Sequence, residues 1–180
     1  MRLFVSIDLP EKVQKKLHGW LPDQLGLRYT REEQLHLTLL FLGECTTRQK
    51  NEIIGKLSGI IFNPFELTIS GLGAFPDRKD PRVIWAGVKE HTELLKLQNH
   101  ISSTLKDFTE ENENREFHPH ITLARTNKRF VYKQNDQLFE PGESISFNVD
   151  FFSLKKSVLS PEGSMHSVLN KFRANNNSDE

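Results

Sequence analysis

The sequence contains the pattern His-x-Thr-Leu twice, at residues 36–39 and 120–123. Each copy lies within a short apolar run of the kind that forms a β-strand, over about 34–42 and 119–125. A single copy of so short a pattern carries little information. Two copies, both in predicted strands, constrain the fold, because both strands must have one face in the core and one face free.

Residues two apart point to the same face of a strand. His36 therefore shares a face with Thr38, and His120 shares a face with Thr122. The apolar residues between them point the other way, into a core. The two strands are thus predicted to present two imidazoles and two hydroxyls to one cleft.

The remaining sequence alternates between strand and helix patterns. Further strands are predicted at 2–9, 65–73, 82–88, 145–153, 154–159 and 166–172, and helices at about 10–21, 47–59 and 91–107. This order, in which hairpins are mixed with helical connections, predicts an α+β fold with helices outside mostly antiparallel sheets. Because each motif follows a helix, the sequence also hints at two similar halves.

Length and composition favour one intracellular domain. The 180 residues carry 24 basic and 24 acidic side chains, so no strong overall charge attracts nucleic acid or membranes. A single cysteine, Cys45, excludes internal disulfides. We find neither a signal peptide nor an apolar stretch long enough for a membrane span. We therefore expect one cytoplasmic, monomeric domain over 1–173 and a disordered tail over 174–180.

Paired imidazoles suit phosphoryl chemistry. A neutral imidazole can take a proton from water, and an imidazolium can give one to a departing oxygen, because histidine titrates near neutral pH. The threonine hydroxyls can donate to phosphate oxygens. No carboxylate cluster accompanies the motifs, so we expect no metal and no other cofactor.

The sequence resembles the 2H phosphoesterase superfamily, and within it the RNA 2′,3′-cyclic phosphodiesterases, also called 2′-5′ RNA ligases. The resemblance extends over most of the chain and includes residues 2–10, 36–43, 75–76, 81–88 and 117–125. It implies a bilobed α+β fold in which two pseudo-symmetric lobes surround a central cleft. It also implies hydrolysis of an RNA 2′,3′-cyclic phosphate to a 2′-phosphate without metal, with the reverse ligation as a second reaction.

The resemblance assigns a role to each position that matches the family pattern. His36 matches the general acid that protonates O3′, and His120 the general base that activates water. Thr38 and Thr122 match the phosphate-binding threonines. Phe41 and Arg125, each five residues after a motif histidine, match a residue that stacks a nucleobase and one that holds a phosphate or ribose.

Strict alternation conflicts with the last two roles, because it places Phe41 and Arg125 on the faces opposite the histidines. The sequence leaves open whether each strand bends or its end lets these side chains reach round.

Two C-terminal positions depart from the family pattern: Lys155 and His166 stand where the family commonly has tyrosine. Lys155 is interpreted as one of a solvated lysine pair, and His118 as a surface or supporting residue beside the second motif. Two other functions remain open, namely a related enzyme acting on another cyclic or 2′-5′-linked nucleotide and a non-catalytic nucleotide-binding module.

Overall fold

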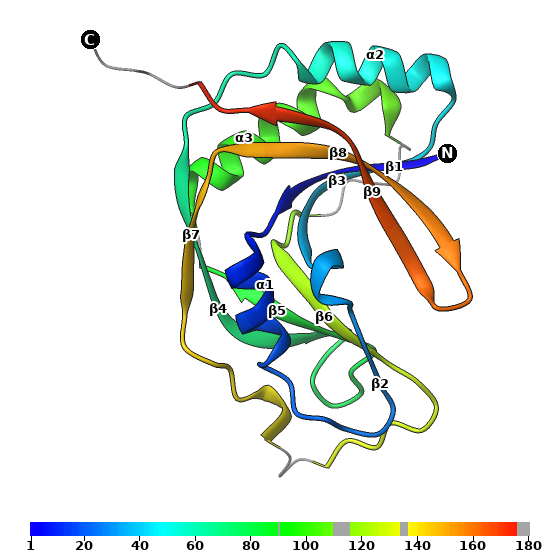
Figure 1. Cartoon of the computed structure of the whole chain (residues 1–180), viewed down its shortest axis with the longest axis vertical. Helices are drawn as coiled ribbons and strands as arrows, with labels where there is room; N and C mark the ends of the chain where they lie inside the picture. The colour runs from blue at the N-terminus through cyan, green and yellow to red at the C-terminus, as the bar shows by residue number, and fades with distance from the viewer. Residues whose placement is uncertain (90, 110–115, 134–136, 176–180) are drawn as a thin grey trace.

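The computed structural model describes residues 1–89, 91–109, 116–133 and 137–175. Two antiparallel sheets dominate it (Figure 1). One has the strand order β3-β1-β8-β9 and the other β2-β6-β5-β4-β7. Each motif lies on a strand of a different sheet, β3 in the first and β6 in the second. The predicted α+β class is therefore confirmed.

The elements are β1 (Arg2–Asp8), α1 (Glu11–His18), β2 (Leu27–Tyr29), η1 (Glu32–Gln34), β3 (His36–Glu44), α2 (Thr47–Leu57), β4 (Phe65–Phe75), β5 (Val83–Val88), α3 (Thr92–Thr104), η2 (Lys106–Phe108), β6 (His120–Thr126), η3 (Gln137–Phe139), β7 (Ile145–Val149), β8 (Phe151–Ser160) and β9 (Gly163–Arg173).

The helices cover the outer faces of the sheets. The buried residues of α1, Val13 and Leu17, belong to the same apolar core as Leu123 of β6. Helix α3 packs against β3 and β4 and lies beside α2 at one end of the molecule (Figure 1). The two motif strands are thereby fixed on their core faces, which leaves their other faces free.

Three details differ from the sequence prediction. The strand predicted over 145–153 is broken at Asp150, which separates β7 from β8. The short strand β2 was missed, because three residues are too few to show alternation. The helix predicted over 91–107 ends at Thr104 and continues as the 3-10 turn η2.

The predicted tail over 174–180 is described only at its first two residues. The backbone N–H of Ala174 donates to Asp150, and that of Asn175 donates to Phe62. Residues 176–180 lie outside the described residues.

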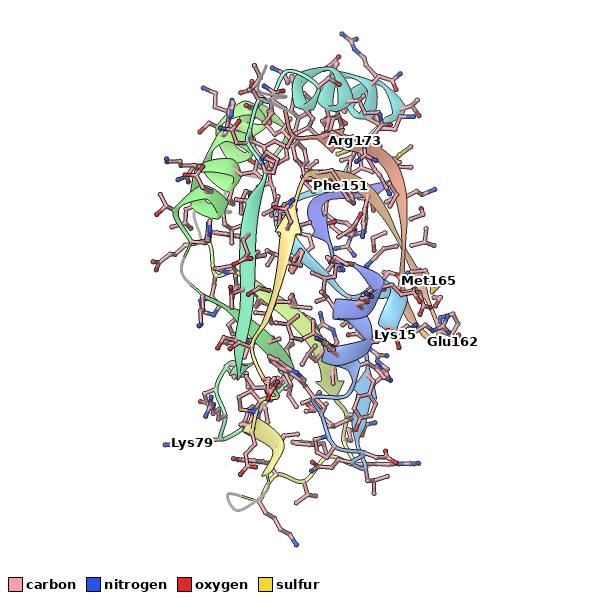
Figure 2. All side chains as sticks on the ribbon, turned by 60° about the vertical axis from the view of Figure 1, so that its left-hand side comes forward. Lys15, Lys79, Phe151, Glu162, Met165 and Arg173 are labelled. Carbon is pink, nitrogen blue, oxygen red and sulfur yellow. The ribbon has the colours of Figure 1, made fainter. Side chains whose placement is uncertain are left out.

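Strands β8 and β9 form a long hairpin that reaches beyond the rest of its sheet. Figure 2 shows Glu162 and Met165 near its tip, far from Phe151 and Arg173 at its base. Arg31 holds the tip, since its guanidinium contacts the Glu162 carboxylate at 2.5 Å and the Met165 sulfur at 3.7 Å. The hairpin therefore adds a wall beside the first motif strand.

Candidate active site

One cavity of about 840 Å³ receives residues from both sheets. Its lining includes all six residues that the sequence proposed for the site, namely His36, Thr38, Phe41, His120, Thr122 and Arg125. The two motifs, far apart in sequence, therefore meet in one place. The volume falls within the usual range for small-molecule sites.

A β-bulge in each motif strand explains how Phe41 and Arg125 reach this cavity. In β3 the pairing with β1 passes from Thr38 directly to Leu40, so Leu39 has no partner. An extra residue of this kind reverses the alternation beyond it. Leu39 and Leu40 are consequently both buried, and the exposed Phe41 returns to the face of His36.

The second motif strand has its bulge at the equivalent position. Pairing with β5 passes from Thr122 to Ala124, which leaves Leu123 unpaired. Leu123 and Ala124 are both buried, and the exposed Arg125 rejoins the face of His120. The open question about alternation is therefore answered by a bend within each strand, and the two halves share this irregularity.

Both motif histidines are oriented in the same way. Nδ1 of His36 lies 2.7 Å from the carbonyl oxygen of Gln34, and Nδ1 of His120 lies 2.7 Å from that of His118. A carbonyl oxygen only accepts, so each Nδ1 carries a hydrogen and donates it. In the neutral rings Nε2 is then the basic nitrogen. His118, interpreted from the sequence as a surface or supporting residue, contacts His120 through its backbone carbonyl.

His36 lies among other rings. Its ring centroid is 5.1 Å from that of Phe4 and 4.9 Å from that of His166. Its Nε2 lies 3.1 Å from the Thr38 hydroxyl oxygen. Burial, together with the positive charge of Lys155, lowers the pKa of His36 to about 4, although the Gln34 carbonyl acts against this. The ring is therefore neutral at pH 7.

His120 has a different setting. Its ring lies edge-on to Phe75, with centroids 4.9 Å apart, and 6.1 Å from Trp85. Burial lowers the pKa of His120, and the positive charge of Arg125 adds to this, against the hydrogen bond to His118. The lowered pKa values favour the neutral, proton-accepting form of both motif imidazoles.

The prediction that Lys155 is solvated is wrong. Its side chain is 9% exposed and forms an ion pair with the carboxylate of Asp8, which also accepts a 2.7 Å hydrogen bond from the Ser153 hydroxyl. Lys155 and Asp8 lie on adjacent strands of one sheet, and Asp8 is the register partner of His36. No sequence pattern signals this pair, because its partners are far apart along the chain.

His166, the second departure from the family pattern, lines the cavity beside His36. The Gln34 side chain holds its backbone: Oε1 accepts from the His166 N–H at 2.6 Å, and Nε2 donates to its carbonyl at 3.4 Å. Within the described part of the chain, Nδ1 of His166 is buried without a hydrogen-bond partner. Gln34 therefore orients His36 with its carbonyl and anchors the hairpin with its side chain.

The described ranges contain neither a metal-binding cluster nor a membrane-spanning helix. No group of three or more His, Cys, Asp or Glu side chains there is arranged to hold a metal ion. No helix there has the length and apolar character needed to cross a membrane.

The sequence and fold match known proteins over nearly the whole chain. Residues 9–158 match the 2′-5′ RNA ligase superfamily. An RNA 2′,3′-cyclic phosphodiesterase of Archaeoglobus fulgidus is 35% identical over 181 residues, which cover 96% of this chain and 99% of that protein. One of Thermotoga maritima is 32% identical over 177 residues, covering 94% and 93% of the two chains.

Solved structures agree. A Thermus thermophilus protein superposes with a TM-score of 0.84 at 30% identity, covering 96% of this chain and 97% of that one. Escherichia coli LigT, solved in complex with 3′-AMP, gives 0.80 at 27% identity with the same coverage, 96% and 97%. The resemblance noted in the sequence is confirmed.

Proposed function

The chain belongs to the 2′-5′ RNA ligase superfamily, and from that premise we propose that it is an RNA 2′,3′-cyclic phosphodiesterase working without metal. One observation carries the proposal: two imidazoles, each fixed through Nδ1 and each followed by a threonine, line one cavity. Relatives named RNA 2′,3′-cyclic phosphodiesterase support the choice of substrate.

In the proposed reaction, Nε2 of His120 takes a proton from a water molecule as the water oxygen attacks phosphorus. The bond between phosphorus and O3′ breaks, and Nε2–H of His36 gives its proton to O3′. The products are a 2′-phosphate and a free 3′-hydroxyl. Thr38 and Thr122 donate hydrogen bonds to the non-bridging oxygens, where negative charge accumulates.

The general-acid role requires a proton that a neutral His36 lacks at pH 7. The substrate itself supplies the condition for protonation, because a phosphodiester anion next to an imidazole favours the charged ring and raises its pKa. The Thr38 hydroxyl, which contacts Nε2 of the neutral ring, is then free to turn to the phosphate. His36 thus becomes an acid when the substrate is bound.

The same groups can join two RNA ends when a 5′-hydroxyl replaces water as the nucleophile. Nε2 of His120 takes the proton of the 5′-hydroxyl as its oxygen bonds to phosphorus, the bond between phosphorus and O3′ breaks, and His36 gives its proton to O3′, which leaves a 2′-5′ phosphodiester. Ligation of a 2′,3′-cyclic phosphate end to a 5′-hydroxyl end is therefore the second reaction that we propose for this site.

Product analysis tests the proposal. A short RNA ending in a 2′,3′-cyclic phosphate is incubated with the protein in EDTA, and the position of the product phosphate is determined. We expect a 2′-phosphate, and expect His36→Ala and His120→Ala each to abolish its formation. A 3′-phosphate, or near-full activity of either variant, would contradict the assignment. Adenosine diphosphate ribose 1″,2″-cyclic phosphate and 2′-5′ oligoadenylate are assayed in parallel. Faster turnover of either one would favour the related enzyme that acts on another cyclic or 2′-5′-linked nucleotide.

A further inference from the structure

Two arginines stand side by side in the cavity wall next to the second motif. Arg28 on β2 pairs in register with Arg125 on β6, so the two side chains leave the sheet on the same face. Both are exposed, and both line the cavity. Arg28 belongs to the short strand that the sequence did not predict, and nothing in the motifs points to it.

The charge of this pair is not balanced by the protein. Among the residues that the structure describes, neither guanidinium has a carboxylate within 4.0 Å, whereas Arg31 on the same wall is paired with Glu162. Like charges directly opposite one another on neighbouring strands destabilise a sheet. Two guanidinium groups that converge on a cavity are a natural site for a phosphate, which each can bind through two hydrogen bonds.

The spacing separates this pair from the phosphate that reacts. Thr122 pairs with Trp85 and Arg125 with Val83, so the pair of arginines lies two register positions farther along the sheet than Thr122. Two steps correspond to about 7 Å, which the sugar and backbone of one nucleotide can bridge. A phosphate held by Thr122 therefore leaves the next one within reach of the arginines.

We propose that Arg28, together with Arg125, binds the phosphate on O5′ of the terminal nucleoside. The site then prefers an RNA end, or a 5′-phosphorylated nucleotide, to a cyclic mononucleotide with a free 5′-hydroxyl. This inference rests on the proposed function, since it takes the reacting phosphate to be the one between the motifs.

A binding cycle tests it without catalysis. The ligands are adenosine 2′-monophosphate and adenosine 2′,5′-bisphosphate, and the proteins are the wild type, Arg28→Gln and, as a matched control, Arg129→Gln. Arg129 is exposed after β6 and does not line the cavity. We expect the 5′-phosphate to raise affinity about tenfold in the wild type and the control, and less than about threefold in Arg28→Gln. Arg28→Lys should show an intermediate increase in affinity from the 5′-phosphate, because lysine keeps the charge but cannot donate the two parallel hydrogen bonds of a guanidinium.

The same gain in Arg28→Gln as in the wild type, or no gain in the wild type, would overturn the inference. Turnover extends the test to RNA: a dinucleotide ending in a 2′,3′-cyclic phosphate is compared with its uncharged methylphosphonate analogue. An advantage of the charged linkage that is lost in Arg28→Gln supports an RNA backbone subsite, and no advantage overturns that part. Failure of the proposed function is separate, since the wild type would then leave 2′,3′-cyclic AMP intact while the binding cycle still reports on Arg28.

Discussion

The β1–β3 half and the β5–β6 half of the molecule position their histidines with the same backbone devices. In each, the histidine is the first residue of the motif strand, its Nδ1 donates to the carbonyl two residues earlier, and a bulge follows the threonine. The side chains around the two rings differ. His36 has Phe4, His166 and a buried ion pair, whereas His120 has Phe75, Trp85 and Arg125.

The backbone thus fixes the positions of the two imidazoles, and we expect the side chains around each ring to determine which proton transfer it performs. The hairpin of β8 and β9 covers only the His36 side, and it brings Lys155 and His166 with it. The pair formed by Arg28 and Arg125 lies on the sheet that carries His120. Four experiments test this contrast.

Replacing each histidine should have the largest effect. We expect His36→Asn and His120→Asn each to lower kcat about 10³-fold, because each removes one proton transfer. A substrate whose 3′ bridging oxygen is replaced by sulfur separates the roles, since a thiolate leaves without a proton. Its turnover should be nearly normal in His36→Asn and remain low in His120→Asn.

Equal losses of both variants on the sulfur substrate would contradict the division into acid and base. Binding of adenosine 2′-monophosphate, measured for both variants, shows that the cavity is intact.

The buried ion pair should give the next largest effect. Lys155→Met leaves the Asp8 carboxylate, whose side chain is 19% exposed, without its partner. We expect a loss of about 3 kcal/mol in the free energy of unfolding, because an uncompensated buried charge is costly. In urea titrations the double variant Lys155→Met/Asp8→Asn should recover most of this loss. Similar instability of the single and double variants would show that packing, rather than charge, is what matters.

The low pKa of His36 should appear in the pH dependence of stability. Its folded pKa of about 4 lies below the usual 6.5, so the unfolded chain binds this proton first. The contribution of the neutral, buried His36 to the free energy of unfolding is fully present above pH 6.5 and is lost as pH falls toward 4. Between pH 7 and 4.5, we expect the free energy of unfolding of the wild type to fall by about 2 kcal/mol more than that of His36→Asn. Parallel pH profiles of the two proteins would contradict a neutral, buried His36.

The sequence predicted the local features and missed those that depend on distant contacts. The strand pattern at 34–42 and 119–125 was enough to place His36 and His120, because two-residue periodicity is local. It could not reveal the bulges, since Leu39 and Leu123 look like ordinary core residues and their lack of a partner depends on the neighbouring strand.

The site's wider surroundings were hidden for the same reason. Lys155 looks like half of a solvated lysine pair until β8 is paired with β1, which brings Asp8 against it. Arg28 lies on a three-residue strand whose pairing partner, β6, is about a hundred residues farther along the chain. Family resemblance supplied roles for Phe41 and Arg125, but only the bulges explain how their side chains reach the cavity.

The smallest expected effect compares these two equivalent positions. We expect Phe41→Ala and Arg125→Gln each to weaken binding of a dinucleotide with a 2′-phosphate by about 1–2 kcal/mol, the first by losing a stacking surface and the second by losing a charged contact. The Phe41 ring is 57% exposed, so its removal should hardly change stability. Salt distinguishes the two: the loss in Arg125→Gln should shrink between about 50 and 200 mM salt, whereas that in Phe41→Ala should not. An identical salt response would mean that Phe41 and Arg125 make the same kind of contact with the substrate. The two halves would then differ only in the surroundings of their histidines.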